Sequence, residues 1–473
     1  MGNSVSRIQE PSSGQAEPLL RRESKRGELR PSDRPGTRSF QLLRFGKRLP
    51  RAFRKIPWEQ SRVLLLQGPV GPFFKVLQSR LLQDGIDAWR ICFNAGDLAF
   101  SSRKNRITFM GSRREWRDWL NEILASNTID TIVMFGSERP AHIVARELAS
   151  IHGVRVISLE EGYIRPGYVT LEESGNNACS PVAGCLPPEN YGSVYDGSGK
   201  TDFKSFRKMS AHGAIYYAIR TLFSFGKQRE LYHRPISAFP EMFYWVRNAG
   251  RRILGQSHNF STIQTLLEYW NKKYYIVPLQ VAVDANLQAS ALGWDSVRLI
   301  SAAIRSFSQS APNDTRLVFK IHPMERGHNN FGPLIQSTAA TLGVGDRVDV
   351  IDVGSMGLLA RHAAGMITIN SSSGLSAIFH GTPLLVIGKA IYAHPELAIC
   401  ADGNPDFDSF WSSSHVAEAP FRHRYLAWLK EECLIPGDYY APHGMTLACD
   451  GILKSLTDGT VIVDSENAAR VAC

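Results

Sequence analysis

Residues 131–159, TIVMFGSERPAHIVARELASIHGVRVISL, decide the fold class of this chain. The stretch begins and ends with short apolar runs, 131–135 and 154–159, that are rich in β-branched residues and typical of buried strands. Between them, residues 141–151 place apolar side chains at helical spacing. A strand, a helix and a second strand in this order predict a parallel sheet with helices on both faces.

The same rhythm extends in both directions from this stretch. On its N-terminal side, residues 63–67 read as a buried strand, and apolar residues at helical spacing follow the turn at 68–72. On its C-terminal side, an aromatic and basic segment at 190–265, in which we expect irregular helices, interrupts the rhythm. Further strands are predicted at 274–279, 316–321, 348–351, 366–369 and 384–387. Each half therefore reads as a doubly wound α/β unit, and we expect the two units to face each other across a ligand cleft.

This pattern divides the chain into five parts. We expect a disordered basic tail at 1–58, a Rossmann-like N-terminal domain at 59–189, a helical bridging segment at 190–265, a Rossmann-like C-terminal domain at 266–425, and a C-terminal helix and tail at 426–473.

The positive charge of the chain is concentrated in the tail. The formal net charge is +10, and residues 1–55 account for +9 of it, with 14 Lys or Arg against 5 Asp or Glu. From residue 40 the basic residues alternate with Phe and Leu, which suits the surface of an anionic membrane. A merely solubilising tail is the alternative. The nearly neutral remainder argues against a nucleic-acid partner.

Composition and cysteine usage narrow the class of protein. The 473 residues are 43% hydrophobic, yet no apolar run approaches the roughly 20 residues that a membrane-spanning helix needs. No signal-peptide pattern opens the chain, so we expect a cytoplasmic location. The 7 cysteines are scattered, which favours neither a zinc site nor a disulfide framework.

A pair of carboxylates ends the predicted strand at 154–159. Glu160 and Glu161 are followed by Gly162, which allows a sharp turn, and then by Arg165. Adjacent side chains leave a strand on opposite sides, so one carboxylate can enter the cleft while the other braces the scaffold. A carboxylate in the cleft can serve as nucleophile or general base. The alternative is a surface pair in a salt bridge with Arg165.

Two polar clusters follow strands of the C-terminal half. Lys320 and His322 end the strand at 316–321, and Pro323 then directs the chain out of the sheet. A histidine there can donate to a phosphate oxygen or protonate a leaving group. The hydroxyls at 371–373, namely Ser371, Ser372 and Ser373, precede a predicted helix, whose first N–H groups can cradle a phosphate. A structural histidine and ordinary helix capping are the alternatives.

Two loops of the N-terminal half are rich in turn residues. Gly68, Pro69 and Gly71 form a loop that matches neither a dinucleotide fingerprint nor a Walker motif, and we interpret it as a rigid lining of the cleft. Asn94 and Asp97 follow the next strand and could join this loop, although a plain turn explains them equally well.

Taken in order, these motifs resemble the capsule polysaccharide biosynthesis and export family of the KpsS/KpsC and LipB type. The segments that carry the resemblance are 67–74, 93–97, 160–166, 168–173 with Asn176, 320–323 with 326–327, 370–377 and 388–392. They run from about residue 62 to residue 397 and omit the basic tail.

The resemblance implies a GT-B fold and transfer of β-Kdo from CMP-Kdo to a (lyso)phosphatidylglycerol or Kdo-lipid acceptor, at the inner membrane and with a capsule assembly complex as a possible partner. The trio of acidic-acidic-Gly, His-Pro and Ser-Ser is also similar to that of bacterial sialyltransferases. On that analogy Glu160 faces the sugar, while His322 and the serines hold the CMP phosphate. If cation and hydroxyl contacts of this kind stabilise the leaving phosphate, the transfer needs neither a metal nor a cofactor. Arg139, Arg165 and Lys320 are candidates to bind the carboxylate of the sugar.

The chain departs from the family pattern at one place. The family usually shows Asp-x-Gln after Pro-Leu-Gln, whereas here 278–280 is followed by Asp284-Ala285-Asn286. The residues leave open whether Glu160 acts with retention or inversion, and the resemblance favours retention. Two other functions remain open: a non-catalytic polysaccharide-binding export component, and a GT-B enzyme that uses another nucleotide sugar.

Overall fold

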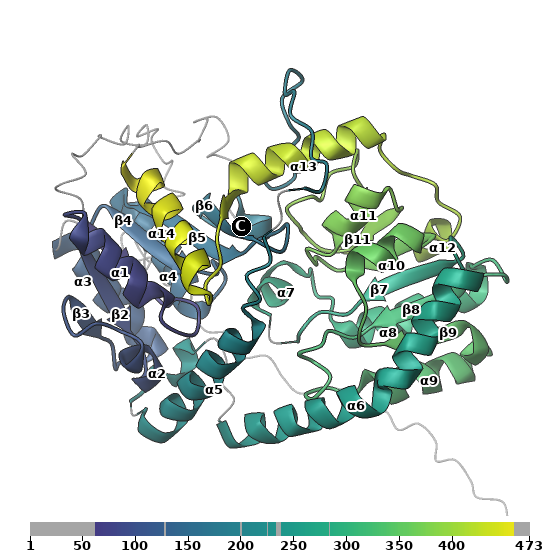
Figure 1. Ribbon diagram of the computed structural model, residues 1–473, viewed down its shortest axis with the longest axis horizontal. Helices are drawn as coiled ribbons and strands as arrows, with labels where there is room; N and C mark the ends of the chain where they lie inside the picture. The colour runs from purple at the N-terminus through teal and green to yellow at the C-terminus, as the bar shows by residue number, and fades with distance from the viewer. Residues whose placement is uncertain are drawn as a thin grey trace, which may run out of the picture. The chain divides into compact units, whose positions relative to one another are not determined.

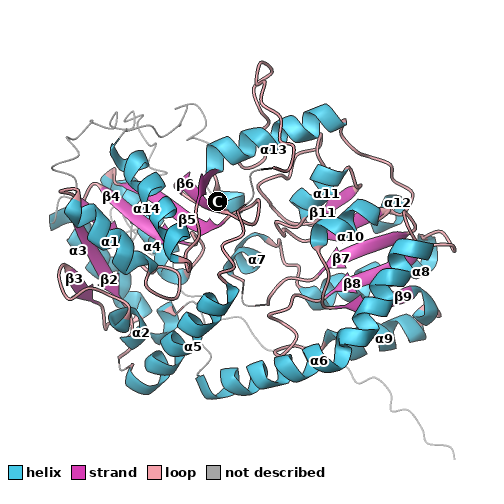
Figure 2. Ribbon diagram, in the orientation of Figure 1, coloured by secondary structure: helices cyan, strands magenta, loops and turns pink. Residues whose placement is uncertain are grey.

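A computed structural model describes residues 62–126, 129–198, 201–224, 226–232, 238–282 and 284–457 (Figure 1). The predicted basic tail lies outside these residues. Strands and helices alternate through both halves of the described chain (Figure 2).

The first sheet is built from the N-terminal half and has the strand order β13-β6-β5-β4-β1-β2-β3. Its strands are β1 Arg62–Leu65, β2 Asp87–Cys92, β3 Arg106–Thr108, β4 Thr131–Phe135, β5 Arg155–Glu161, β6 Tyr168–Glu173 and β13 Leu434–Pro436. Its helices are α1 Phe73–Gln83, α2 Ala95–Ala99, α3 Arg113–Ser126, α4 Pro140–His152 and α14 Pro442–Thr457. Strands β1 to β5 are parallel, whereas β6 runs antiparallel to β5 and β13 antiparallel to β6.

Apolar side chains point alternately to the two faces of this sheet, and helices cover both faces. Val63 and Leu65 pack on one side, in the core that includes α1 and α14, while Leu64 packs on the other side with α3 and α4. Each strand is therefore buried on both faces, which explains why its sequence is almost continuously apolar.

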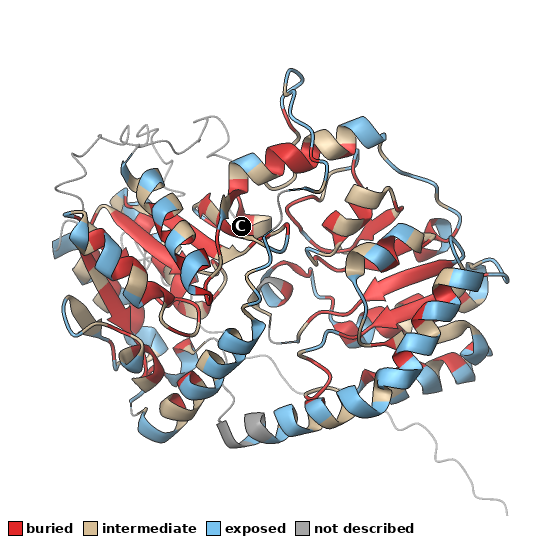
Figure 3. Ribbon diagram, viewed as in Figure 1, coloured by how far each residue is buried: buried red, intermediate tan, exposed pale blue. Residues whose placement is uncertain are grey.

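The second sheet has the order β12-β11-β10-β7-β8-β9, and all its strand pairs are parallel. Its strands are β7 Tyr274–Pro278, β8 Arg316–Lys320, β9 Val348–Ile351, β10 Gly365–Thr368, β11 Leu384–Val386 and β12 Ile399–Cys400. Its helices are α7 Ala285–Ser290, α8 Ser296–Ser310, α9 Phe331–Thr341, α10 Met356–His362, α11 Gly374–His380, α12 Phe407–Phe410 and α13 Ala419–Cys433, with the 3-10 turn η4 at Gly345–Arg347. Two apolar cores cover its two faces, and the strands are the most deeply buried part (Figure 3).

These two sheets confirm the predicted α/β class, with two doubly wound units of the kind that make up a GT-B fold. Each strand predicted from an apolar run overlaps a strand of the structure. The predicted strand at 154–159 is longer than expected, because β5 continues through Glu161 and pairs there with Val169 of β6.

The segment between the sheets is more regular than the sequence indicates. It holds η2 Asn177–Cys179, α5 Phe206–Phe223, η3 Gln228–Leu231 and α6 Ala238–Tyr269. The expectation of irregular helices is wrong for α6, which runs without interruption for 32 residues. Among the described residues, no helix has both the length and the apolarity that crossing a bilayer requires.

The end of the described chain returns to the first sheet. Strand β13 pairs with β6, and α14 packs against α1. Tyr439, Tyr440 and Ile452 are buried in the core on that face. The segment expected as a C-terminal helix and tail thus contributes both a strand and a covering helix to the first sheet.

Candidate active site

The carboxyl edge of the second sheet gathers most of the polar residues that the sequence singled out. In the register of the parallel strands, Pro278 of β7 lies opposite Lys320 of β8, and Lys320 lies opposite Ile351 of β9. Strand β10 flanks β7 on its other side. The segments that follow these strands therefore leave the sheet at one edge, where doubly wound sheets bind their ligands.

Gln280 and Asn370 close the centre of this edge. The Gln280 side-chain amide donates to Asn370 Oδ1 at 2.9 Å, and the Asn370 backbone N–H donates to Gln280 Oε1 at 3.2 Å. This reciprocal pair joins the segments after β7 and β10 and positions the start of the serine loop. The side chain of Asn286, at the place where the chain departs from the family pattern, lies outside the description.

His322 begins a tight turn after β8, and its imidazole is exposed. The backbone N–H of Met324 donates to His322 Nδ1 at 3.2 Å, and Glu325 N donates to the His322 carbonyl at 2.8 Å. Because Nδ1 accepts a hydrogen bond, the neutral ring carries its hydrogen on Nε2. The turn thereby orients the imidazole so that Nε2 is its donor.

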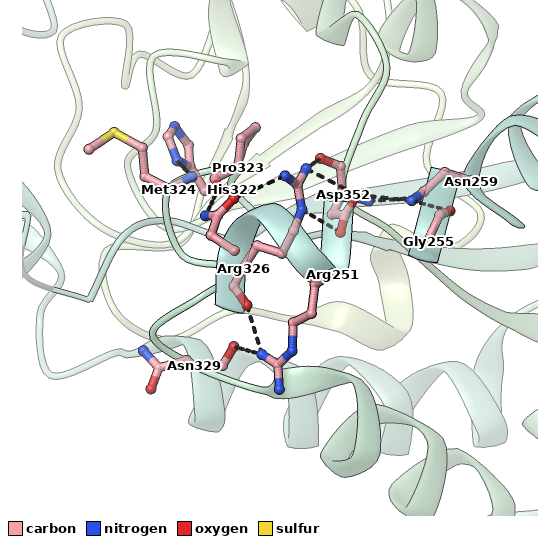
Figure 4. Close-up of polar contacts among 10 residues, drawn as sticks. Arg251, Gly255, Asn259, His322, Pro323, Met324, Arg326, Asn329 and Asp352 are labelled. Carbon is pink, nitrogen blue, oxygen red and sulfur yellow. Dashed lines mark hydrogen bonds and ion pairs between the residues drawn. The ribbon is translucent and has the colours of Figure 1, made fainter. Parts of the chain in front are cut away.

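Helix α6 holds this turn in place (Figure 4). Asn248 donates to the carbonyl of Pro323 at 2.7 Å, and Arg251 donates to the carbonyl of Arg326 at 2.7 Å. A Cβ at Gly327 would lie 2.0 Å from the backbone oxygen of Tyr244, so the helix and the turn touch without room for a side chain.

An ion pair between Arg326 and Asp352 completes the clamp. Arg326 Nε lies 2.6 Å from Asp352 Oδ2, and Arg326 Nη2 also donates to the Asp352 carbonyl at 2.7 Å. Asn259 of α6 donates to Asp352 Oδ1 and accepts from the Asp352 N–H, each at 2.9 Å. The turns after β8 and β9 are therefore fixed to each other and to α6.

Lys320 lies beneath this network and is buried. Burial lowers the pKa of its ammonium group, and the nearby Asp352 opposes that shift. The buried position of the Lys320 ammonium group favours a structural role beneath the edge of the sheet over contact with a ligand at the surface.

The serine loop lies between β10 and α11. Ser373 donates to Ser371 Oγ through its backbone N–H at 3.2 Å and through its hydroxyl at 2.8 Å. The Tyr392 hydroxyl donates to the Ser371 carbonyl, and Tyr392 approaches so closely that a Cβ at Gly374 would lie 2.2 Å from it. Ser372 is exposed at the tip. The N–H groups of Ser371, Ser373 and Gly374 donate within this segment, so the hydroxyl of Ser372 is the phosphate ligand that the tip of the loop offers.

Glu160 and Glu161 lie on β5 at the carboxyl edge of the first sheet. The hydroxyl of Tyr439 donates to the Glu160 carbonyl at 2.9 Å, which fixes the strand next to the C-terminal segment. Burial raises the pKa of Glu161, and Arg165 opposes that shift. Arg165 donates to the Gly162 carbonyl at 2.8 Å and so braces the turn itself.

Gly162 is required by the close return of the chain. A Cβ at this position would lie 2.3 Å from the carbonyl oxygen of Tyr168. The glycine therefore lets β5 and β6 join directly beside the two carboxylates.

Arg139 connects Glu160 to the glycine-rich loop. The buried guanidinium donates to Gln67 Oε1 at 3.2 Å and to the Gly68 carbonyl at 3.1 Å. Burial lowers the pKa of Arg139, while the negative charges of Glu160 and Asp97 oppose that shift. Arg139 thus anchors the loop that contains Gly68, Pro69 and Gly71, and its positive charge interacts with the negative charge of Glu160.

Asn94 and Asp97 are buried and bind each other and helix α5. Asn94 caps α2 by accepting from the Asp97 N–H at 3.0 Å, and the hydroxyl of Tyr216 donates to Asp97 Oδ1 at 2.9 Å. Burial raises the pKa of Asp97, with Arg90 opposing. These contacts make the pair a support for the edge, and Tyr216 is a member that sequence reasoning missed.

The C-terminal segment supplies the other residues that were missed. Tyr439 and Tyr440 are buried, and burial raises the pKa of both phenols. The charge of Glu161 adds to both shifts, and that of Glu160 adds to the shift of Tyr439. Asp438 accepts a hydrogen bond from Ser205 at 2.7 Å. The sequence feature that could have indicated these residues is the Pro-Gly turn at 436–437 followed by two tyrosines, but it lies far along the chain from Glu160.

Comparison with known proteins places this site in a family. The sequence profile described as "Capsule polysaccharide biosynthesis protein" matches residues 130–440. The chain belongs to this family. It is 31% identical over 383 residues to the capsule polysaccharide export protein KpsS of Escherichia coli, covering 80% of this chain and 97% of that one. It is 30% identical over 396 residues to the capsule polysaccharide modification protein LipB of Neisseria meningitidis serogroup A, covering 80% and 92% of the two chains.

A solved structure is similar in outline. The β-Kdo 2,7 transferase of Thermosulfurimonas dismutans KpsC matches with a TM-score of 0.37 and 14% identity, over 83% of this chain and 99% of that one. In the described part of the chain, no group of three or more His, Cys, Asp or Glu side chains is arranged to hold a metal ion.

The contact between α6 and the His322 turn yields a first prediction. Gly327→Ala forces a Cβ against the Tyr244 carbonyl, so we expect it to lower the free energy of unfolding by about 1–3 kcal/mol. Gly332→Ala is the matched control, because its nearest atom is 3.9 Å away, and it should change stability by less than about 0.5 kcal/mol. Equal denaturation midpoints for the two variants would contradict the close packing.

The raised pKa of Glu161 predicts a pH dependence of stability. The unfolded carboxyl ionises near its ordinary value, whereas the folded one keeps its proton to higher pH, so the folded state binds more protons. Stability should therefore fall as pH rises from the ordinary carboxyl pKa through the raised folded value. Urea denaturation of wild type and Glu161→Gln across this range measures the effect. The variant should lose part of the slope, and an unchanged slope would refute the assignment.

Proposed function

We propose that this protein is a glycosyltransferase of capsule biosynthesis that transfers Kdo from CMP-Kdo to a (lyso)phosphatidylglycerol or Kdo-lipid acceptor. The observation that carries the proposal is the carboxyl edge of the second sheet, where a histidine with its donor nitrogen set by a turn shares the edge with a three-serine loop. Family membership supports the same reading, because the relatives are named for capsule polysaccharide export and modification.

On this proposal the second sheet stabilises the leaving group. Departure of CMP leaves negative charge on its phosphate, which hydrogen-bond donors already in place can stabilise without reorganisation. His322 Nε2–H and the hydroxyl of the exposed Ser372 are such donors. These groups are expected to make transfer independent of metal and of any cofactor.

The first sheet supplies the carboxylate. With retention, Glu160 attacks the anomeric carbon of Kdo as the bond to CMP breaks, and the acceptor hydroxyl then displaces Glu160 and passes its proton to the phosphate of CMP. With inversion, Glu160 takes the proton of the acceptor hydroxyl directly. In both schemes Glu161, Gly162 and Arg165 hold the strand and its turn.

A second function is favoured by the name of one relative. The Escherichia coli protein is called an export protein, so a role in binding polysaccharide without transfer is the competing hypothesis. The two hypotheses differ in whether purified protein makes a product.

The decisive assay combines purified protein, CMP-Kdo, lysophosphatidylglycerol and EDTA, with product detected by mass spectrometry. Wild type should form a Kdo-lipid, and Glu160→Gln should lower kcat at least about 100-fold because the nucleophile or base is lost. Glu122→Gln, a change on the exposed surface of α3, is the control and should retain full activity. Absence of product with wild type and with Kdo-lipid acceptors, or full activity of Glu160→Gln, would contradict the proposal.

A further inference from the structure

The part of helix α6 before Ser261 buries polar side chains and exposes apolar ones. Asn248 and Asn259 are buried and, with Arg251, bind the turns at 322–329 and at Asp352. Further along the helix, Ile263 and Leu266 are buried in an apolar core of the second sheet. A surface helix ordinarily turns its apolar stripe toward the core, as α6 does at Ile263 and Leu266, whereas the large apolar residues before Ser261 are exposed.

The outward side of α6 carries five large apolar residues. Phe243 is 62% exposed, Val246 68%, Ile253 72%, Leu254 85% and Phe260 58%. Their spacing of 3, 7, 1 and 6 residues keeps them on one side of a helix with 3.6 residues per turn, opposite Asn248 and Asn259. Figure 3 shows this helix exposed along much of its length.

The neighbouring helix α5 contacts α6 and also exposes large apolar side chains, namely Phe206, Ile215, Leu222 and Phe223. At 3.6 residues per turn, Ile215, Leu222 and Phe223 share one side of α5, and Phe206 lies on the opposite side. Among the described residues, 19 large apolar side chains are exposed, and 10 of them lie between residues 206 and 260. Such a concentration marks a surface that another phase or molecule covers.

The same segment is strongly basic. Residues 206–260 contain 9 Lys or Arg and 2 Asp or Glu, a net charge of +7, whereas the rest of the chain after residue 55 carries −6. Arg207, Lys208 and Arg252 are exposed on α5 and α6. Of the nine cations, Arg220 is buried, and Arg247 and Arg251 donate to carbonyls of the turn at 322–329, so the exposed cations carry the positive charge that this surface offers.

We propose that the outward side of α6, together with α5, docks on the surface of an anionic lipid bilayer. Exposed Phe and Leu enter the boundary between headgroups and acyl chains, and each nearby cation adds about 1 kcal/mol of attraction to anionic lipid. This surface is distinct from the basic tail at 1–58. Because the other side of α6 holds the His322 turn, docking brings that turn to within about one helix diameter, roughly 10 Å, of the bilayer.

Sedimentation of the full chain with vesicles tests the proposal. Vesicles of phosphatidylcholine alone are compared with vesicles that also contain phosphatidylserine, an anionic lipid outside the proposed acceptor class, so that docking is separated from acceptor binding. Wild type should bind the anionic vesicles, and the triple variant Val246→Gln, Ile253→Gln, Leu254→Gln should bind them at least about tenfold more weakly.

A matched variant controls for the loss of exposed apolar residues in general. Ile151 is 68% and Val194 62% exposed, and both lie outside the docking surface, so Ile151→Gln with Val194→Gln should bind as wild type does. Equal thermal unfolding of all variants shows that they are folded. The proposal is overturned if the triple variant retains wild-type affinity, which would leave the basic tail as the anchor. Equal wild-type binding to both vesicle types, or to neither, also overturns it.

Discussion

The ion pair between Arg326 and Asp352 is the interaction on which the carboxyl edge of the second sheet depends. Its two side chains are 6% and 16% exposed, so breaking it would leave a poorly solvated charge in the protein. It joins the turns after β8 and β9, and Asn259 attaches the pair to α6. The position of His322 and the orientation of α6 follow from the same few contacts.

This coupling explains why the part of α6 before Ser261 does not turn its apolar residues toward the core. Its asparagines and arginines satisfy the carbonyls and the carboxylate of two turns, which a hydrophobic side could not do. The apolar residues of this part lie on the other side, while Ile263 and Leu266 pack in the core of the second sheet. Under the proposed function one helix serves two purposes: it orders the polar edge that we propose for the nucleotide sugar, and it offers the surface that we propose for a lipid bilayer. An enzyme whose donor is water-soluble and whose acceptor is a lipid needs both properties close together.

Much of the fold could be predicted from the sequence because buried parallel strands leave a strong local signal. The apolar runs at 131–135 and 316–321 each predict a buried strand, and polar residues follow the end of each run. Because Glu160 and His322 stand at the ends of predicted strands, the sequence places them at the edges of the sheets. The contributions of Tyr439 and Tyr440 could not be predicted, because β13 has 3 residues and its partner β6 lies over 260 residues earlier in the chain. Nor does an apolar stripe in a sequence reveal whether it faces the core, since the inward contacts of α6 come from turns about 75 residues away.

We propose that the phosphate of a cytidylate nucleotide binds between His322 and the serine loop at the carboxyl edge of the second sheet. A crystal structure of the protein with CMP is the decisive experiment. Phosphate oxygens are expected within hydrogen-bond distance of His322 Nε2 and of Ser372. A nucleotide bound elsewhere, away from both residues, would contradict it.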